Sequence, residues 1–378
     1  MPMAAAESQY VCVEEREYCV ELASAAEQPR LWRGIGRLAC FFALVACLAF
    51  AMDALVTSGL RRIKTSAFGA SNVVMEGKVN ADVLITGSSR ALVQYDPRAI
   101  EATTGLSAFN LGRNGSQTDM QVAFLKAYLA HNRRPKIVLH NLDAFSFVTT
   151  REVFDPVQYR PYLYDSSLYE ASRKINPSIW KSRYIPLYGY VVDDMNLNWM
   201  RGLAGFVGWS PRGDYFLGFN PRHRTWTNEF DKFRTANPAG VRFEIEPAGV
   251  QDLENLIQLC KQNGIQLILV YSPEYSQMQK LTTNRAEIFA RFHELADRNG
   301  VPIWDYSNWD HDSDRNFFYN SQHLNATGAA AFSSDMANRL QQFLLAQRSS
   351  TAEKAARDGH LATMSVNRIA VTNRLKGQ

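Results

Sequence analysis

The sequence predicts an α/β domain with a parallel sheet, attached to a membrane by one N-terminal helix. Three observations lead to this prediction: a long apolar segment near the N-terminus, short apolar runs typical of buried strands, and amphipathic helical segments between those runs. Strands that alternate with helices form crossover units, and such units place neighbouring strands parallel in one sheet.

The apolar segment at residues 35–60 predicts a membrane anchor. From Leu38 to Leu60 the only charged residue is Asp53, and a run of this length can cross a hydrocarbon core of about 30 Å as a helix. A cleaved signal peptide is the alternative, because Ala49-Phe50-Ala51 resembles a cleavage site. The stretch before the segment is long for a signal peptide, which favours the anchor. Basic residues flank both ends, so the positive-inside rule does not decide the orientation.

Around this anchor the chain is expected to divide into consecutive parts. They are an N-terminal tail (1–34), the anchor (35–60), a connector (61–80), the α/β domain (81–346) and a mobile basic tail (347–378). Within the domain, residues 151–245 are rich in aromatic residues and are broken by Pro and Gly, which indicates an insertion. Its aromatic side chains either fill an irregular core or line a cleft for sugar rings.

Composition argues against several classes of function. The net charge is only +4 and the basic residues form no stripe, so nucleic acid is not an expected partner. Only Cys260 lies beyond the anchor, which excludes a disulfide within the domain. No cysteine spacing suggests zinc, and neither a metal nor an organic cofactor is expected.

The remaining elements follow from apolar periodicity. The first strand is the apolar run 82–86, which ends at Gly87. The elements expected after it are helix 97–103, a strand ending at Asn110, helix 117–131, strand 136–142, helix 248–263, strand 265–271, helix 283–298, strand 301–304 and helix 325–348.

Three polar segments are expected at the edge where parallel strands end, which is the usual working edge of such sheets. Ser89 follows the first strand, the glycine-containing loop up to Ser116 follows the second, and His323 precedes the last helix. Each segment alone is common in turns and helix caps. Together, a serine hydroxyl and an imidazole are the minimum for acyl transfer, and glycines let backbone N–H groups approach an oxyanion.

The segments DVLITGSSR (82–90), FNLGRNG (109–115) and FFYNSQHLNATG (317–328) resemble the SGNH, or GDSL-like, hydrolase superfamily. The resemblance covers roughly residues 80–150 and 250–345. It is nearest to a membrane-anchored branch that includes bacterial alginate O-acetyltransferases and the D-alanyl transfer protein of teichoic acids. The expected fold is therefore a three-layer SGNH-like parallel sheet with flanking helices.

The resemblance implies roles for individual residues. Ser89 falls on the nucleophile, which also donates its own N–H to the oxyanion, and His323 falls on the general base. Gly115 falls on the oxyanion-hole glycine, with Gly112 as the alternative. Asn320 stands at the orienting aspartate of the histidine block. Two further residues beside these positions, Asn114 and Arg90, are candidates for contact with substrate. For Arg90 a surface ion pair is the default interpretation, and contact with an anionic substrate is the alternative.

The sequence departs from the family pattern at two positions. Leu142 occupies the place of the oxyanion-hole asparagine, and the loss of one donor costs about 10²–10³ in rate. Asn320 can orient an imidazole but cannot supply negative charge. Replacement carboxylates are available just upstream, at Asp310, Asp312 and Asp314.

These features predict an O-acyltransferase or esterase that acts on an envelope or exported polysaccharide through a serine acyl-enzyme. A polysaccharide-binding or assembly component with an impaired site is the alternative. The resemblance further implies an inner-membrane, single-pass protein with a periplasmic domain and an integral membrane partner that exports acyl groups. A domain tethered on the cytoplasmic side is the alternative, because the flanking charges are balanced.

Overall fold

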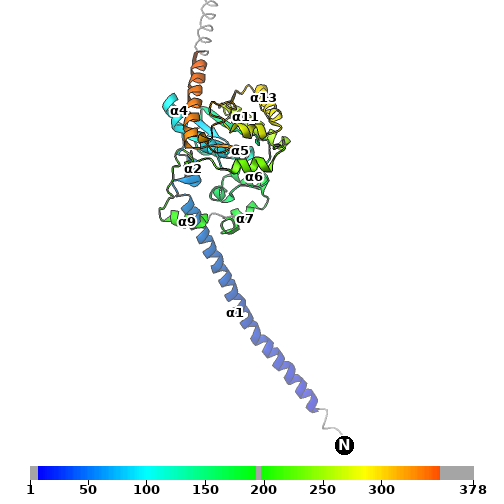
Figure 1. Ribbon diagram of the computed structural model, residues 1–378. Helices are drawn as coiled ribbons and strands as arrows, with labels where there is room; N and C mark the ends of the chain where they lie inside the picture. Colours follow the sequence, from blue (N-terminus) through cyan, green and yellow to red (C-terminus); the bar gives the residue numbers. More distant parts are fainter. Residues whose placement is uncertain (1–6, 193–196, 350–378) are drawn as a thin grey trace, which may run out of the picture.

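The computed structural model describes residues 7–192 and 197–349, and side chains within the first helix from Trp32 onward. The predicted mobile basic tail, apart from residues 347–349, lies outside the described residues, as do the first six residues of the N-terminal tail. The chain consists of a long N-terminal helix that leads into an α/β domain, and the C-terminal helix leaves the domain at the opposite end (Figure 1).

A five-stranded parallel sheet with the order β2-β1-β3-β4-β5 forms the centre of the domain. The α/β fold class predicted from the sequence is therefore confirmed. The strands are β1 (Val83–Thr86), β2 (Ala108–Asn110), β3 (Ile137–Leu142), β4 (Gln266–Tyr271) and β5 (Ile303–Asp305). A separate antiparallel hairpin consists of β6 (Phe318–Asn320) and β7 (His323–Leu324).

Helices cover both faces of the sheet, because alternate side chains of each strand point to opposite faces. Leu84 and Val138 belong to one hydrophobic core, whereas Val83 and Leu139 belong to the other. The first core is closed by α2 (Ser66–Met75), α5 (Thr118–His131), α11 (Pro247–Gln262) and α13 (Arg285–Asn299). The second is closed by α3 (Ser89–Gln94), α4 (Pro97–Thr104), α12 (Ser276–Leu281) and the C-terminal helix 326–349. The result is the expected three-layer arrangement.

The described residues of segment 151–245 contribute no strand to the sheet. Its elements are η1 (Pro156–Gln158), η2 (Arg160–Tyr162), α6 (Ser166–Ile175), α7 (Ile179–Tyr184), α8 (Tyr188–Val192), α9 (Asn198–Phe206) and α10 (Glu229–Ala236); the short η3 (Arg315–Phe317) lies later in the chain. Some of its aromatic side chains, such as Tyr162, Phe219 and Phe230, are buried in the cores, whereas others, such as Trp180 and Trp209, are exposed. Core filling therefore accounts for only part of the aromatic enrichment.

The first helix, α1 (Glu7–Leu60), contains the predicted anchor. Its part from Trp32 to Leu60 is long and apolar enough to cross a membrane, and almost none of it is buried in the protein. Only its C-terminal end packs into the domain, where Val56 and Leu60 are buried. In the predicted connector, α2 follows directly and covers the sheet.

Candidate functional site

The end of strand β1 places Ser89 at the start of helix α3. Gly87 adopts a φ of +143°, and a Cβ at this position would lie 2.8 Å from the Cβ of Asn141, so glycine is needed at this turn. Ser88 caps the helix by accepting the N–H of Arg90 at 3.2 Å. Ser89 is thus the first helical residue, and a backbone N–H at this position has no partner within its own helix.

The β6–β7 hairpin brings His323 to Ser89 from the far end of the chain. The Nε2 atom of His323 lies 2.8 Å from the Oγ atom of Ser89, and both side chains are partly exposed. The side-chain amide of Gln94, from the last turn of α3, donates to the backbone oxygen of Gln322 at 3.0 Å and fixes the hairpin against the helix. The structure therefore brings together the two residues expected to carry the chemistry.

Asn320 determines which nitrogen of His323 carries the proton. Its Oδ1 atom accepts the backbone N–H groups of Gln322 at 3.1 Å and His323 at 2.9 Å, so the oxygen end of this amide faces the imidazole. The same oxygen lies 2.9 Å from Nδ1 of His323. Nδ1 must therefore donate, which leaves Nε2 as the acceptor that faces the Ser89 hydroxyl.

The environment keeps His323 neutral. Burial lowers the pKa of His323 to about 3, and the positive charges of Arg90 and Arg222 act in the same direction. The ring of Tyr319 stacks on the imidazole at a centroid distance of 5.3 Å. A neutral imidazole can accept a proton, so His323 is in the correct state for a general base over most of the pH range, although so low a pKa makes it a weaker base than an ordinary histidine.

The carboxylates considered as replacements do not reach the histidine. Nδ1 is bonded to Asn320, and within the described residues His323 forms no ion pair. Asp314 instead caps η3 through the N–H of Asn316 at 2.9 Å. Along the described chain, the serine, histidine and asparagine form a triad without a carboxylate.

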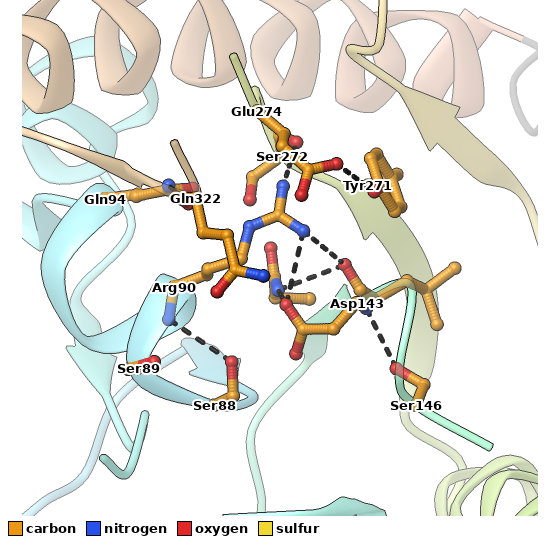
Figure 2. Close-up of polar contacts among 12 residues, drawn as sticks. Ser88, Ser89, Arg90, Gln94, Asp143, Ser146, Tyr271, Ser272, Glu274 and Gln322 are labelled. Carbon is orange, nitrogen blue, oxygen red and sulfur yellow. Dashed lines mark hydrogen bonds and ion pairs between the residues drawn. The ribbon is translucent and has the colours of Figure 1, made fainter. Parts of the chain in front are cut away.

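Arg90 is not at the surface, so the surface ion pair expected from the sequence is wrong. Its side chain is buried behind Ser89, where the guanidinium pairs with Asp143 at 3.3 Å and donates to the backbone oxygen of Ser272 (Figure 2). It also donates to the backbone oxygen of Pro273 at 3.3 Å. Burial opposes the charge on Arg90, but the surrounding acidic groups outweigh this effect and raise its pKa. These internal contacts give the guanidinium a structural role, because they hold neighbouring segments together. The prediction that Arg90 contacts substrate is corrected accordingly.

The loop after β2 lies against the turn that precedes Ser89. The backbone N–H of Arg113 donates to the oxygen of Gly87 at 3.0 Å. Gly112 is buried and its N–H donates to Oδ1 of Asn110 at 2.8 Å, so it is not available as an oxyanion donor. Gly115 is exposed at a φ of +65°, and Asn114 beside it is exposed as well. Of the two glycines, Gly115 is the exposed one.

The end of β3 supplies no side-chain donor to the serine. Leu142 is fully buried in the core, as its apolar side chain requires. The neighbouring Asn141 accepts the hydroxyl of Tyr95 at 2.8 Å and donates to Asp143 at 3.0 Å. Its amide is therefore committed to the interior, and backbone N–H groups are the remaining oxyanion donors.

A pocket of about 330 Å³ has Leu92 of α3, Asn114 of the second loop and Arg222 of segment 151–245 in its wall, together with Thr65 and Ser66 at the base of α2. Ser89 and His323 are not among its lining residues. The link to the site is Arg222, which the sequence did not single out and which is close enough to His323 to influence its pKa. Segment 151–245 thus contributes a charged side chain to the surroundings of the histidine.

Solved structures with a similar fold include three that are matched over most of their own length. They are a psychrotrophic esterase from Pseudoalteromonas sp. (TM-score 0.37, 11% identity, 69% of this chain and 97% of the other), a putative acylhydrolase from Bacteroides fragilis (0.34, 12%, 70% and 86%) and a GDSL-like lipase from Bacteroides thetaiotaomicron (0.32, 10%, 73% and 100%). No family model matches the chain, and no curated protein matches its sequence. The similarity is distant, so the functional argument depends on the residues of this chain.

Replacing Asn320 by aspartate tests the neutral triad. The wild-type His323 pKa of about 3 predicts that the rate of Ser89 acylation by an activated ester shows no inflection near the ordinary value of 6.5. A carboxylate favours the imidazolium and raises the His323 pKa, so the Asn320→Asp rate falls as pH drops through this higher pKa. At alkaline pH the variant is expected to react faster, by up to about 10⁴.

The matched control is Asn316→Asp, which adds the same charge on an exposed position of the same loop. It should retain the wild-type pH profile. A wild-type rate that already falls near 6.5 would contradict the neutral state of His323, as would identical profiles for the two variants.

Replacing Arg90 by methionine tests whether its buried ion pair and hydrogen bonds stabilise the fold. The substitution keeps most of the side-chain volume but leaves Asp143 buried without its partner, and we expect a loss of about 3–5 kcal/mol in unfolding free energy. Arg98→Met removes the exposed ion pair with Asp96, at 2.8 Å, and should cost at most about 1 kcal/mol. Denaturant titration of the detergent-solubilised chain measures the unfolding free energy of both variants. Equal losses of unfolding free energy would contradict the structural role of Arg90.

Proposed function

We propose that the protein is a membrane-anchored serine O-acyltransferase or esterase. The observation that carries this proposal is the chain of hydrogen bonds from Ser89 Oγ through His323 to Asn320, at 2.8 and 2.9 Å. A hydroxyl that faces the unprotonated nitrogen of an oriented imidazole is arranged to act as a nucleophile. Both side chains are accessible at the edge where the strands end.

In the first half-reaction, Ser89 Oγ attacks the carbonyl carbon of an acyl donor while His323 Nε2 takes the hydroxyl proton. The negative oxygen is stabilised by the backbone N–H groups of Ser89 and Gly115. The tetrahedral intermediate collapses, the donor's leaving oxygen receives the proton from His323, and an ester on Ser89 remains. Asn320 holds the imidazolium in place throughout but does not neutralise it.

In the second half-reaction, an acceptor hydroxyl gives its proton to His323 and attacks the acyl-enzyme. The new ester leaves after His323 returns the proton to Ser89 Oγ. Water as the acceptor gives an esterase, and a sugar hydroxyl gives a transferase. Arg222, which is close enough to His323 to influence its pKa, lines a pocket together with Asn114, and both side chains offer polar groups for such an acceptor.

The sequence resemblance favours an envelope or exported polysaccharide as the acceptor. The same resemblance underlies the proposed inner-membrane location with a periplasmic domain, and the proposed integral partner that supplies acyl groups. The apolar helix α1 is consistent with a membrane anchor by its length and composition. No metal or organic cofactor enters this mechanism.

A polysaccharide-binding or assembly component is the second candidate. Asn320 and Leu142 favour it, because the first removes the charge that normally stabilises the imidazolium and the second removes a side-chain oxyanion donor. The exposed aromatic residues of the insertion also suit contact with sugar rings.

An acyl-transfer assay separates the two candidates. The full-length protein is incubated with an activated acetyl ester and polysaccharide, and acetyl groups are measured on the polymer and as free acetate. Ser89→Ala and His323→Ala should both reduce turnover to background, whereas Ser313→Ala, at an exposed serine, should not change it. Absence of wild-type turnover, with polymer binding that Ser89→Ala leaves intact, would favour the binding component.

A further inference from the structure

Apolar side chains are exposed on α7, α8 and α9 and on the residues that follow them. We refer to this surface as the collar and define it by Tyr184, Val191, Val192, Met200, Val207 and Trp209. Val191 is 78% exposed and Val207 is 81% exposed. Aliphatic side chains with this exposure are unfavourable in water, and a contiguous group of them indicates a contact surface.

The collar lies where α1 enters the domain. Asp53 of α1 pairs with Arg160 at 2.7 Å and accepts the backbone N–H of Leu187, just before α8, at 2.9 Å. One turn later, Thr57 is 2.8 Å from the hydroxyl of Tyr190 on α8. Helices α7 and α9 are at the end of the domain from which α1 projects (Figure 1).

Glycines fix α9 against α1 at the same level. A Cβ on Gly59 would lie 1.7 Å from the backbone oxygen of Gly202, and a Cβ on Gly205 would lie 2.4 Å from the oxygen of Gly59. Such contact between backbones requires small residues on both helices, as at helix crossings in membranes. The collar therefore has a fixed position along the axis of α1.

The length of α1 places the collar relative to a bilayer. Residues 35–52 of the apolar segment precede its contact with the domain at Asp53. At 1.5 Å per residue they span about 27 Å, close to the thickness of the hydrocarbon core, and Arg37 near the outer end can extend its side chain to the headgroups. A bilayer crossed by this part of α1 must end close to Asp53, which is the level of α8 and α9.

The composition of the three helices fits a membrane interface. They contain no acidic residue, whereas Lys181 and Arg183 lie on α7 and Arg201 lies on α9; in the sequence, Asp193 and Asp194 directly follow α8. Tyrosine and tryptophan accompany them, at Tyr184 and Trp199. Aromatic and basic residues together are typical of segments that lie in the headgroup region.

We propose that the collar inserts into the headgroup region of the membrane that α1 crosses, and so seats the domain on the lipid surface. The pocket lined by Leu92, Asn114 and Arg222 also includes Thr65 and Ser66, which closely follow the end of α1. Seating therefore holds this pocket near the membrane surface. The proposal depends on α1 being an anchor and not on the chemistry of Ser89.

Spin labels on single cysteines test the proposal in the full-length chain, after its native cysteines are replaced. The protein is reconstituted into vesicles of phosphatidylcholine and phosphatidylglycerol, and collisions with oxygen and with a water-soluble nickel chelate are measured. The collar positions are Val191→Cys and Val207→Cys. Leu345→Cys is the matched control, because Leu345 is an exposed apolar residue on the C-terminal helix. Leu44→Cys reports on the anchor itself.

We expect the ratio of oxygen to nickel collisions at both collar positions to exceed that at Leu345→Cys several-fold, and to be highest at Leu44→Cys. Collar labels that match Leu345→Cys would overturn the proposal. Collar labels shielded from both reagents would indicate a protein partner and would also overturn it. A water-exposed label at Leu44→Cys would show that α1 is not in the bilayer and would remove its basis. None of these results depends on acyl transfer.

Discussion

One uncharged hydrogen bond, from Nδ1 of His323 to Oδ1 of Asn320, determines what the site can do. Two backbone N–H groups bond to the same oxygen, so the amide cannot turn and the imidazole has a defined tautomer. Without a carboxylate, nothing offsets the dehydration of the ring, and the pKa of His323 falls far below its ordinary value. His323 is therefore unprotonated over most of the pH range and can accept a proton, but the resulting imidazolium gains little stabilisation.

A pair of charged side chains close to Ser89 is buried inside the protein. Arg90 and Asp143 neutralise each other behind α3, and the guanidinium holds backbone oxygens at the ends of β3 and β4. These contacts keep three strand ends in register where the serine, its loop and the hairpin meet. Because breaking a buried pair is costly, the position of Ser89 depends on residues that do not contact a substrate.

Local patterns were sufficient to predict most of the fold. The apolar runs of β1, β3 and β4 and the periodicity of α5 and α11 appear in the sequence because burial on one face or both dictates residue type. Ser89 and His323 were recognisable because they lie at a strand end and shortly before a helix, whereas Asn320 was assigned only through the sequence resemblance. The helix that could cross a membrane was recognisable from its length and apolar composition.

The features missed by sequence reasoning depend on distant partners. Arg90 resembles a surface arginine until Asp143 and the backbone of Ser272 surround it, and no local pattern reveals these contacts. Arg222 comes from segment 151–245 and lies outside its helices, and no local pattern in the sequence links it to His323. The packing of Gly59 on Gly202 joins two helices that are far apart in the sequence. Each of these requires the tertiary structure.

Acyl transfer by this site requires a covalent acyl intermediate on Ser89, which mass spectrometry of the trapped protein detects. The full-length chain is mixed with an activated acyl ester, quenched in acid and digested. We expect one acyl group on the peptide that contains Ser89, bonded to the Oγ of Ser89 and not to that of Ser88. The Ser89→Ala variant should carry none. An unmodified Ser89, or an adduct that survives the substitution, would contradict the proposed acyl intermediate.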